Sequence, residues 1–129
     1  MKVFTINISK KRGQQGEDFA ATFLSKMGIK IIERNFKSVY GEVDIIGEVN
    51  HECLAFIEVK SWSTYQFSDL EYSISTRKRK RIIQTSHIYL LEHPEFELYQ
   101  IRYDILFLTW RSKQLNYITN AFEGDGTPR

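Results

Sequence analysis

The chain has 129 residues, of which 42% are hydrophobic and 26% are charged, and its formal net charge is +2. This length suits one hydrophobic core rather than two, and the composition excludes a disordered or fibrous chain. The longest apolar runs, such as residues 105–108, are far shorter than the ~20 residues that a membrane-spanning helix needs, so we expect no membrane partner. The single cysteine, Cys53, has no second cysteine to pair with, which favours a cytoplasmic location.

The pattern of apolar residues predicts a helix, three strands, a second helix and two further strands, in that order. Residues 1–8 alternate between apolar and polar side chains, which is typical of a short strand or a loose arm. We therefore divide the chain into an N-terminal arm (1–12), a single domain (13–120) and a flexible tail (121–129). The order of elements indicates an α/β fold with a mixed β-sheet flanked by helices. The expected elements are a helix at about 17–27 that ends at Gly28, strands at about 29–36, 40–47 and 53–60, a loop at 61–75, a helix at about 77–91 between Thr76 as its cap and Pro94, and strands at about 101–110 and 115–119.

Two carboxylates are expected to face each other on the hairpin formed by the second and third strands. Residues two apart on a strand point to the same face, which aligns Glu42 with Asp44, and Glu58 with Lys60. If the hairpin turns around His51, Asp44 lies opposite Glu58 and Glu42 lies opposite Lys60. Opposed residues of paired strands are only ~4.5–5.5 Å apart, and like charges at that distance repel each other. A cation is therefore expected between Asp44 and Glu58.

The oxygen ligands of this hairpin suit Mg²⁺ or Mn²⁺ better than zinc. Asp44 and Glu58 supply carboxylates, and the backbone carbonyl of Val59 is the third expected ligand. Lys60 is cationic and unsuited to bind the metal, but it can position a water nucleophile and stabilise the charge that builds on a phosphoryl oxygen. One ion or two would acidify that water and polarise the phosphate. Together these groups predict a site for phosphodiester hydrolysis.

Glu17 is a further candidate for this site, because it lies on the inward stripe of the first predicted helix. Its place in the first helical turn, where an acid interacts favourably with the helix dipole, explains it equally well. For the hairpin, the alternative is an ordinary strand pair with a surface salt bridge between Glu42 and Lys60. That alternative leaves Asp44 and Glu58 among apolar neighbours without partners, so we favour the metal site.

An unbroken run of five basic residues, 77–81, begins the second predicted helix. Such a run is often a solvated helix face and nothing more. Beside a phosphodiester site it has a second explanation, because contacts from Lys and Arg to phosphates supply most of the non-specific affinity for nucleic acids. A helix points its residues in different directions: Arg77 and Arg81 share one face, and Lys78 borders the stripe that contains Ile82. We therefore expect Arg77, Lys78 and Arg81, rather than the whole run, at the substrate.

These residues resemble a known signature. Asp44, followed on the next strand by Glu58-Val59-Lys60, is similar to the Asp…Glu-x-Lys pattern of the restriction-endonuclease-like superfamily, which includes archaeal Holliday junction resolvases. The chain resembles the bacterial YraN family of predicted endonucleases more closely still. The segments that carry this resemblance are Gly13-x-x-Gly16-Glu17, Glu33-Arg34-Asn35-Phe36, Gly41-Glu42-Val43-Asp44, Phe56-Ile57-Glu58-Val59-Lys60, Lys78 and Arg102-Tyr103-Asp104.

The resemblance implies a restriction-endonuclease-like fold with a metal site of Asp44 and Glu58. It implies Glu17 as the acid contributed by the first helix and Lys60 as the catalytic lysine. Nucleic acid is the implied partner, with DNA favoured over RNA, and a homodimer follows if the comparison with resolvases holds.

Three further residues of the chain match the YraN pattern without a clear chemical role: Glu42, Lys78 and Arg102. We place Arg102 with the expected nucleic-acid contacts. The chain departs from the pattern at Trp62, because the family tends to have an arginine two residues after the lysine. A guanidinium that could contact phosphate is therefore missing there, although an indole could stack on a base instead.

A metal-dependent nuclease acting on DNA, including branched DNA, is the leading hypothesis. A nucleic-acid-binding module that keeps the fold without turnover is the second; it predicts salt-sensitive binding in EDTA and no cleavage with any metal. The intact Asp44, Glu58 and Lys60 favour the enzyme. A glycosidase built on the carboxylate pair fits poorly, because it gives Lys60 and the basic helix no task.

Overall fold

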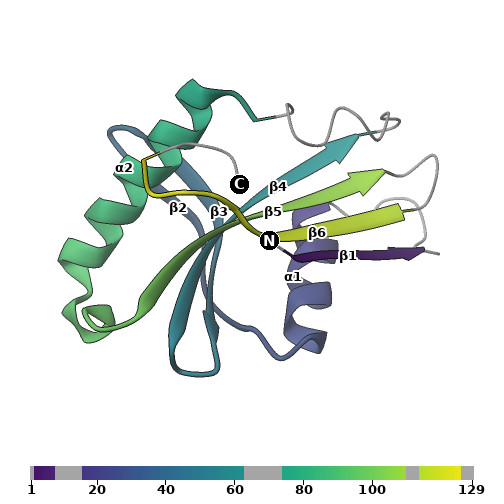
Figure 1. Ribbon diagram of the computed structural model, residues 1–129, viewed down its shortest axis with the longest axis horizontal. Coiled ribbons are helices and arrows are strands. Elements are labelled where there is room, and N and C mark those ends of the chain that lie inside the picture. The colour runs from purple at the N-terminus through teal and green to yellow at the C-terminus, as the bar shows by residue number, and fades with distance from the viewer. Residues whose placement is uncertain (1, 8–15, 63–73, 110–113, 126–129) are drawn as a thin grey trace.

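The fold is built on one six-stranded mixed sheet, seen here in a computed structural model that describes residues 2–7, 16–62, 74–109 and 114–125 (Figure 1). The strands run in the order β1-β6-β5-β4-β3-β2 across the sheet. Neighbouring strands are antiparallel except β4 and β5, which are parallel. The elements in chain order are β1 (Lys2–Asn7), α1 (Gly16–Lys26), β2 (Lys30–Ser38), β3 (Gly41–Val49), β4 (Cys53–Trp62), α2 (Thr76–Glu92), the short 3-10 helix η2 (Pro94–Phe96), β5 (Gln100–Thr109) and β6 (Gln114–Phe122).

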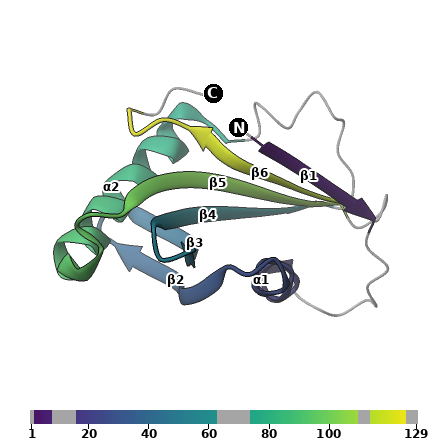
Figure 2. The same ribbon diagram turned by 60° about the horizontal axis from the view of Figure 1, so that its bottom comes forward.

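The two α-helices lie on opposite faces of this sheet (Figure 2). One buried cluster joins α2 to the sheet and contains Phe56 of β4 and Ile82 of the helix. The other joins α1 to the sheet and contains Ile57 of β4 and Leu24 of the helix. Alternate residues of β4 therefore supply the two cores. Since the even-numbered residues of β4 face α2, Glu58 is placed on the face that α2 covers.

The structure confirms the α/β class and each helix and strand expected within the domain, with slightly displaced ends. Residues 2–7 form an edge strand that pairs with β6, so of the two expectations for this segment the structure shows the short strand. β6 continues to Phe122, into the segment expected to be a tail. Of the expected loop at 61–75, Ser61 and Trp62 belong to β4, and residues 63–73 lie outside the described residues. Neither described α-helix is long and apolar enough to cross a membrane.

The cap of α2 is Ser75 rather than the expected Thr76. The Ser75 hydroxyl accepts a hydrogen bond from the Lys78 backbone N–H at 3.1 Å, which satisfies one of the free donors of the first turn. Thr76 instead accepts a hydrogen bond from the guanidinium of Arg79 at 2.8 Å. Arg79 is 9% exposed and also donates to a backbone carbonyl of the preceding residues. One member of the basic run is thus part of the protein's own framework.

Two positions require glycine, one for its backbone conformation and one for close packing. Gly28 has φ +93° and ends α1, as the sequence predicts. Gly47 of β3 lies where β2 begins, and a Cβ atom there would sit 2.6 Å from Cγ2 of Ile29. The absence of a side chain at Gly47 lets the start of β2 pack closely against β3.

Candidate active site

The hairpin of β3 and β4 brings Asp44 beside Glu58. Its register is the one expected from the sequence, with Val49 paired to Cys53 and Ile45 paired to Ile57. One further step in this register sets Asp44 opposite Glu58, where the ladder of paired residues ends. There Asp44 Oδ2 accepts a hydrogen bond from the backbone N–H of Val59 at 2.8 Å. The two carboxylates therefore meet at the end of the paired part of the hairpin.

These carboxylates lie in an environment that disfavours two negative charges. Glu58 is only 4% exposed, and its Oε2 has no hydrogen-bond partner in the described part of the chain. Burial raises the pKa of Asp44 to about 8, and the hydrogen bond with Glu58 and the negative charge of that residue act in the same direction. The Val59 N–H and the positive charge of Lys78 oppose this increase in pKa. A cation close to both oxygens would relieve the repulsion.

Among the described residues, the ammonium of Lys78 forms an ion pair with Glu58. Its Nζ lies 3.2 Å from Glu58 Oε2, so α2 contributes directly to the site. The contact is an ion pair without hydrogen-bond geometry, because the same oxygen has no hydrogen-bond partner in the described residues.

A hard divalent cation fits the donor set of this site. Glu58 Oε2 is a buried acceptor without a hydrogen bond, and Asp44 adds a second carboxylate. In the part of the chain that the structure describes, no group of three or more His, Cys, Asp or Glu side chains could hold an ion. The other ligands would be a backbone carbonyl, for which Val59 is the candidate, and water, which Mg²⁺ retains readily.

Glu17 and Glu42 are held together by a side chain that the sequence argument did not single out. With its amide nitrogen turned toward them, Asn35 donates to Glu17 Oε1 at 2.7 Å and to Glu42 Oε1 at 3.1 Å. Burial raises the pKa of Glu17, and the negative charge of Asp44 raises it further, against the opposing effect of Arg34. The first helix thus places Glu17 within the electrostatic field of the carboxylate pair.

Asn35 also marks a break in the regular alternation of β2 and β3. It has φ +55°, a conformation that asparagine tolerates better than most residues. On β3, Val43 packs with α2 and Ile45 packs with α1, although residues two apart on a regular strand share a face. The expected alignment of Glu42 with the lysine of the Glu-x-Lys motif is therefore wrong. Glu42 instead lies 4.0 Å from Lys37 Nζ on the neighbouring strand.

Lys60 follows Glu58 by two residues on β4 and therefore lies on the same face of the sheet. Its side chain is half-buried. Trp62 is the last residue of β4, and its side chain lies outside the described part of the chain. The structure thus places Lys60 on β4 two residues beyond Glu58, and its part in the site stays a prediction.

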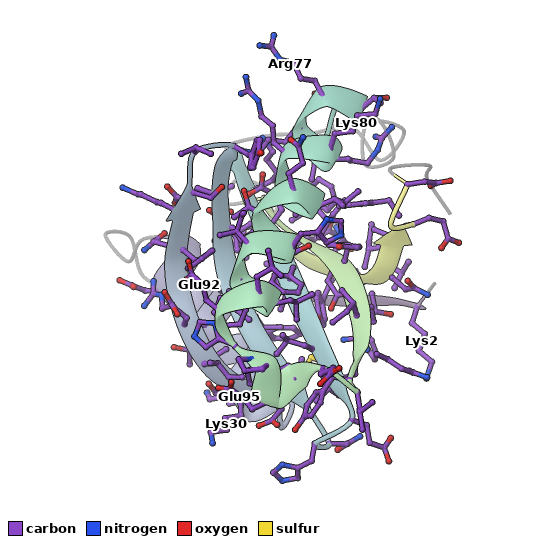
Figure 3. All side chains as sticks on the ribbon, turned by 90° about the vertical axis from the view of Figure 1, so that its left-hand side faces the viewer. Lys2, Lys30, Arg77, Lys80, Glu92 and Glu95 are labelled. Atoms are coloured by element: carbon purple, nitrogen blue, oxygen red, sulfur yellow. The ribbon has the colours of Figure 1, made fainter. Side chains whose placement is uncertain are left out.

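The charges of α2 are segregated along the helix. Arg77 and Lys80 lie at its N-terminal end, whereas Glu92 at its other end and Glu95 of η2 are acidic (Figure 3). The N-terminus of a helix already carries partial positive charge, so basic side chains there are unfavourable unless an anion neutralises them. Arg81, the third expected contact of this helix, is exposed as Arg77 is. This end of α2 is therefore suited to bind a phosphate backbone.

Arg102, one of the expected nucleic-acid contacts, belongs to a hydrogen-bonded network within the protein. Its guanidinium donates to both carboxylate oxygens of Asp104, with Nη2 2.9 Å from Oδ2 and Nε 2.9 Å from Oδ1. Asp104 is fully buried and also accepts hydrogen bonds from the Tyr117 hydroxyl and from the Asn120 N–H. Because Tyr117 packs in the core on the α1 side, this network lies on the opposite face of the sheet from Lys78. We therefore expect Arg102 to stabilise this network rather than to contact the substrate.

The architecture is that of the restriction-endonuclease-like fold: a mixed sheet with a helix on each face and an Asp…Glu-x-Lys hairpin at its centre. The chain belongs to the uncharacterised protein family UPF0102, whose profile matches residues 16–108. This assignment agrees with the family resemblance found in the sequence.

Relatives of this family cover almost the whole chain. A UPF0102 protein of Clostridioides difficile (strain 630) is 36% identical over 114 residues, which are 88% of this chain and 98% of the relative. A UPF0102 protein of Persephonella marina is 37% identical over 114 residues, 88% of this chain and 95% of the relative. A third, from Caldanaerobacter subterraneus subsp. tengcongensis, is 34% identical over 121 residues, 89% of this chain and 98% of the relative.

Proposed function

We propose that the chain is a divalent-metal-dependent nuclease that hydrolyses phosphodiester bonds of DNA, with branched or junction DNA as its substrate class. The observation that supports this most is the meeting of Asp44 with the buried Glu58 on one hairpin, where burial and mutual repulsion raise the pKa of Asp44 to about 8. Two neighbouring carboxylates repel each other when both are ionised. A divalent cation bound between them would stabilise both negative charges.

Each side chain of the site has a separate task in this reaction. Asp44 and Glu58 hold the cation, which supplies Lewis acidity that acidifies a water and polarises the phosphate. Lys60 orients the water and stabilises the negative charge that develops on the phosphoryl oxygens. Glu17 acts beside Asp44 from the first turn of α1, on the far side of the hairpin from Lys78.

The N-terminal end of α2 would bind the phosphate backbone on either side of the reacting bond. Arg77 and Arg81 are exposed there, and the helix dipole adds to their attraction for anions. The net charge of +2 is too small to draw nucleic acid to the whole surface, so affinity must come from this local cluster. A homodimer, which the likeness to resolvases implies, would present two such sites to a branched substrate.

Cleavage of linear and four-way-junction DNA in Mg²⁺ or Mn²⁺ tests the proposal. We expect metal-dependent cleavage that falls by at least about a hundredfold in Glu58→Gln, because a cation ligand of the reacting centre is lost. Asp18→Asn is the matched control, since Asp18 is an exposed acid of α1 that pairs with Arg34 of β2 and not with either acid of the hairpin. Cleavage that persists in Glu58→Gln would contradict the proposal. Salt-sensitive DNA binding in EDTA, together with no cleavage in any metal, would point instead to a binding module.

A further inference from the structure

Lys78 and Glu58 form an unusual pair, because the acid is buried and the base is not. The side chain of Glu58 is 5% exposed and that of Lys78 is 41% exposed, at a separation of 3.2 Å between Oε2 and Nζ. The backbone of Lys78 is fixed in the first turn of α2 by the hydrogen bond to Ser75. The ammonium thus reaches the carboxylate from the rim of the site, on a stem that remains partly in solvent.

The pair is held by charge and not by directed hydrogen bonding. Glu58 Oε2 has no hydrogen-bond partner in the described residues, although Lys78 Nζ is close to it. A lysine ammonium is a compact charge on a flexible stem, which makes it easier to release than the planar fork of an arginine. A buried carboxylate oxygen whose near cation makes no hydrogen bond to it remains open to a better ligand.

The charge of Lys78 acts on both acids of the pair. Besides its contact with Glu58, it lowers the pKa of Asp44 against the effect of burial. Lys78 therefore occupies the electrostatic position that a divalent cation would take. The same lysine stands in the first turn of α2, where the helix dipole repels a positive charge and favours an anion.

We propose that Lys78 is a displaceable counter-ion, which neutralises Glu58 in the metal-free protein and swings away to contact a substrate phosphate when a divalent cation takes its place. This inference rests on the metal site of the proposed function and adds a specific order of events to it. Substrate affinity becomes coupled to metal binding, because a phosphate-binding cation is set free only when the site is filled.

Metal binding without nucleic acid tests the first half of the inference. Calorimetric titration with Ca²⁺ at pH 8 would compare the wild type with Lys78→Met, Lys78→Arg and the exposed control Lys80→Met. Removing the competing ammonium should tighten Ca²⁺ binding by on the order of tenfold in Lys78→Met. Lys78→Arg should weaken it, because a guanidinium holds a carboxylate in bidentate fashion, and Lys80→Met should leave it within about twofold.

The salt dependence of DNA binding tests the second half. The slope of log affinity against log salt should be shallower in Lys78→Met than in the wild type by about one in Ca²⁺, with no difference in EDTA. An unchanged Ca²⁺ affinity in both Lys78 variants would overturn the inference while leaving the nuclease proposal in place. A wild type that binds no divalent cation at all would overturn both. If Lys78→Met does not fold, the Lys78→Arg result alone decides, since only a displaceable counter-ion predicts weaker metal binding there.

Discussion

Replacing Asp44 by asparagine should stabilise the metal-free protein at pH 8. An acid whose pKa is raised by folding stays protonated in the folded protein at pH values where the unfolded chain has lost that proton. The free energy of unfolding then falls as the pH rises from the ordinary pKa of 3.8 to the folded value of about 8, and levels off above it. The amide introduced by Asp44→Asn cannot ionise, so the substitution removes this loss of stability. Its oxygen can still accept the hydrogen bond from Val59.

The size of the effect follows from the pKa of Asp44. Moving an acid from 3.8 to about 8 corresponds to a ceiling of about 6 kcal/mol, at 1.36 kcal/mol for each pH unit. Because water relaxes around a partly exposed group and the negative charge of Glu58 contributes to the raised pKa of Asp44, we expect ~2–3 kcal/mol. This difference is a large fraction of the total stability of a small domain.

Urea denaturation in EDTA at several pH values between 5 and 8 measures this difference. The measured quantity is the free energy of unfolding of Asp44→Asn minus that of the wild type. This difference should grow steadily from pH 5 to pH 8. The titrations that both proteins share cancel in the subtraction. Asp18→Asn, which changes an exposed acid of α1, should show no such growth. A difference that stays constant between pH 5 and 8 would refute the reasoning.

Three further substitutions separate positioning, framework and binding roles, and a fourth tests the packing of β2. Asn35→Ala should lower the cleavage rate by about tenfold or more with a small loss of stability, because two acids lose the amide that joins them; an unchanged rate would contradict this. Arg102→Met should reduce stability by ~3–5 kcal/mol, measured by urea denaturation, because the buried Asp104 loses its ion pair, while the salt slope of DNA binding stays unchanged. Arg77→Met should make the slope of log DNA affinity against log salt shallower, with little change in the free energy of unfolding. Gly47→Ala should cost ~1–3 kcal/mol of stability through overpacking, and a neutral result would mean that β2 can shift.

The hairpin was predictable because its determinants are local. Strand alternation and a turn near His51 are enough to set the register, and Asn50 and His51 both adopt the positive φ that tight hairpin turns use. The juxtaposition of Asp44 and Glu58 follows from that register. The order of helices and strands was predictable for the same reason, since periodicity is a property of each segment alone.

The errors arise where distant segments decide the outcome. No local pattern distinguishes Arg79, which is buried, and Arg102, which is partly buried against Asp104, from Arg77, which is exposed; only the packing of the sheet does so. β1 gains its stability from β6 at the other end of the chain. Glu42 was misplaced because the alternation of β3 breaks beside a left-handed residue of another strand. An asparagine inside a predicted strand, next to its end, is the one sequence signal that could have indicated this break.

The most direct test of the central claim is a crystal structure of the protein soaked in Mn²⁺, with the ion located by its anomalous scattering. A divalent cation held by the carboxylate pair predicts a peak within about 2.5 Å of one oxygen of Asp44 and one of Glu58, with the ammonium of Lys78 withdrawn. A saturated crystal in which Lys78 still contacts Glu58, with no peak between the two acids, would contradict the account.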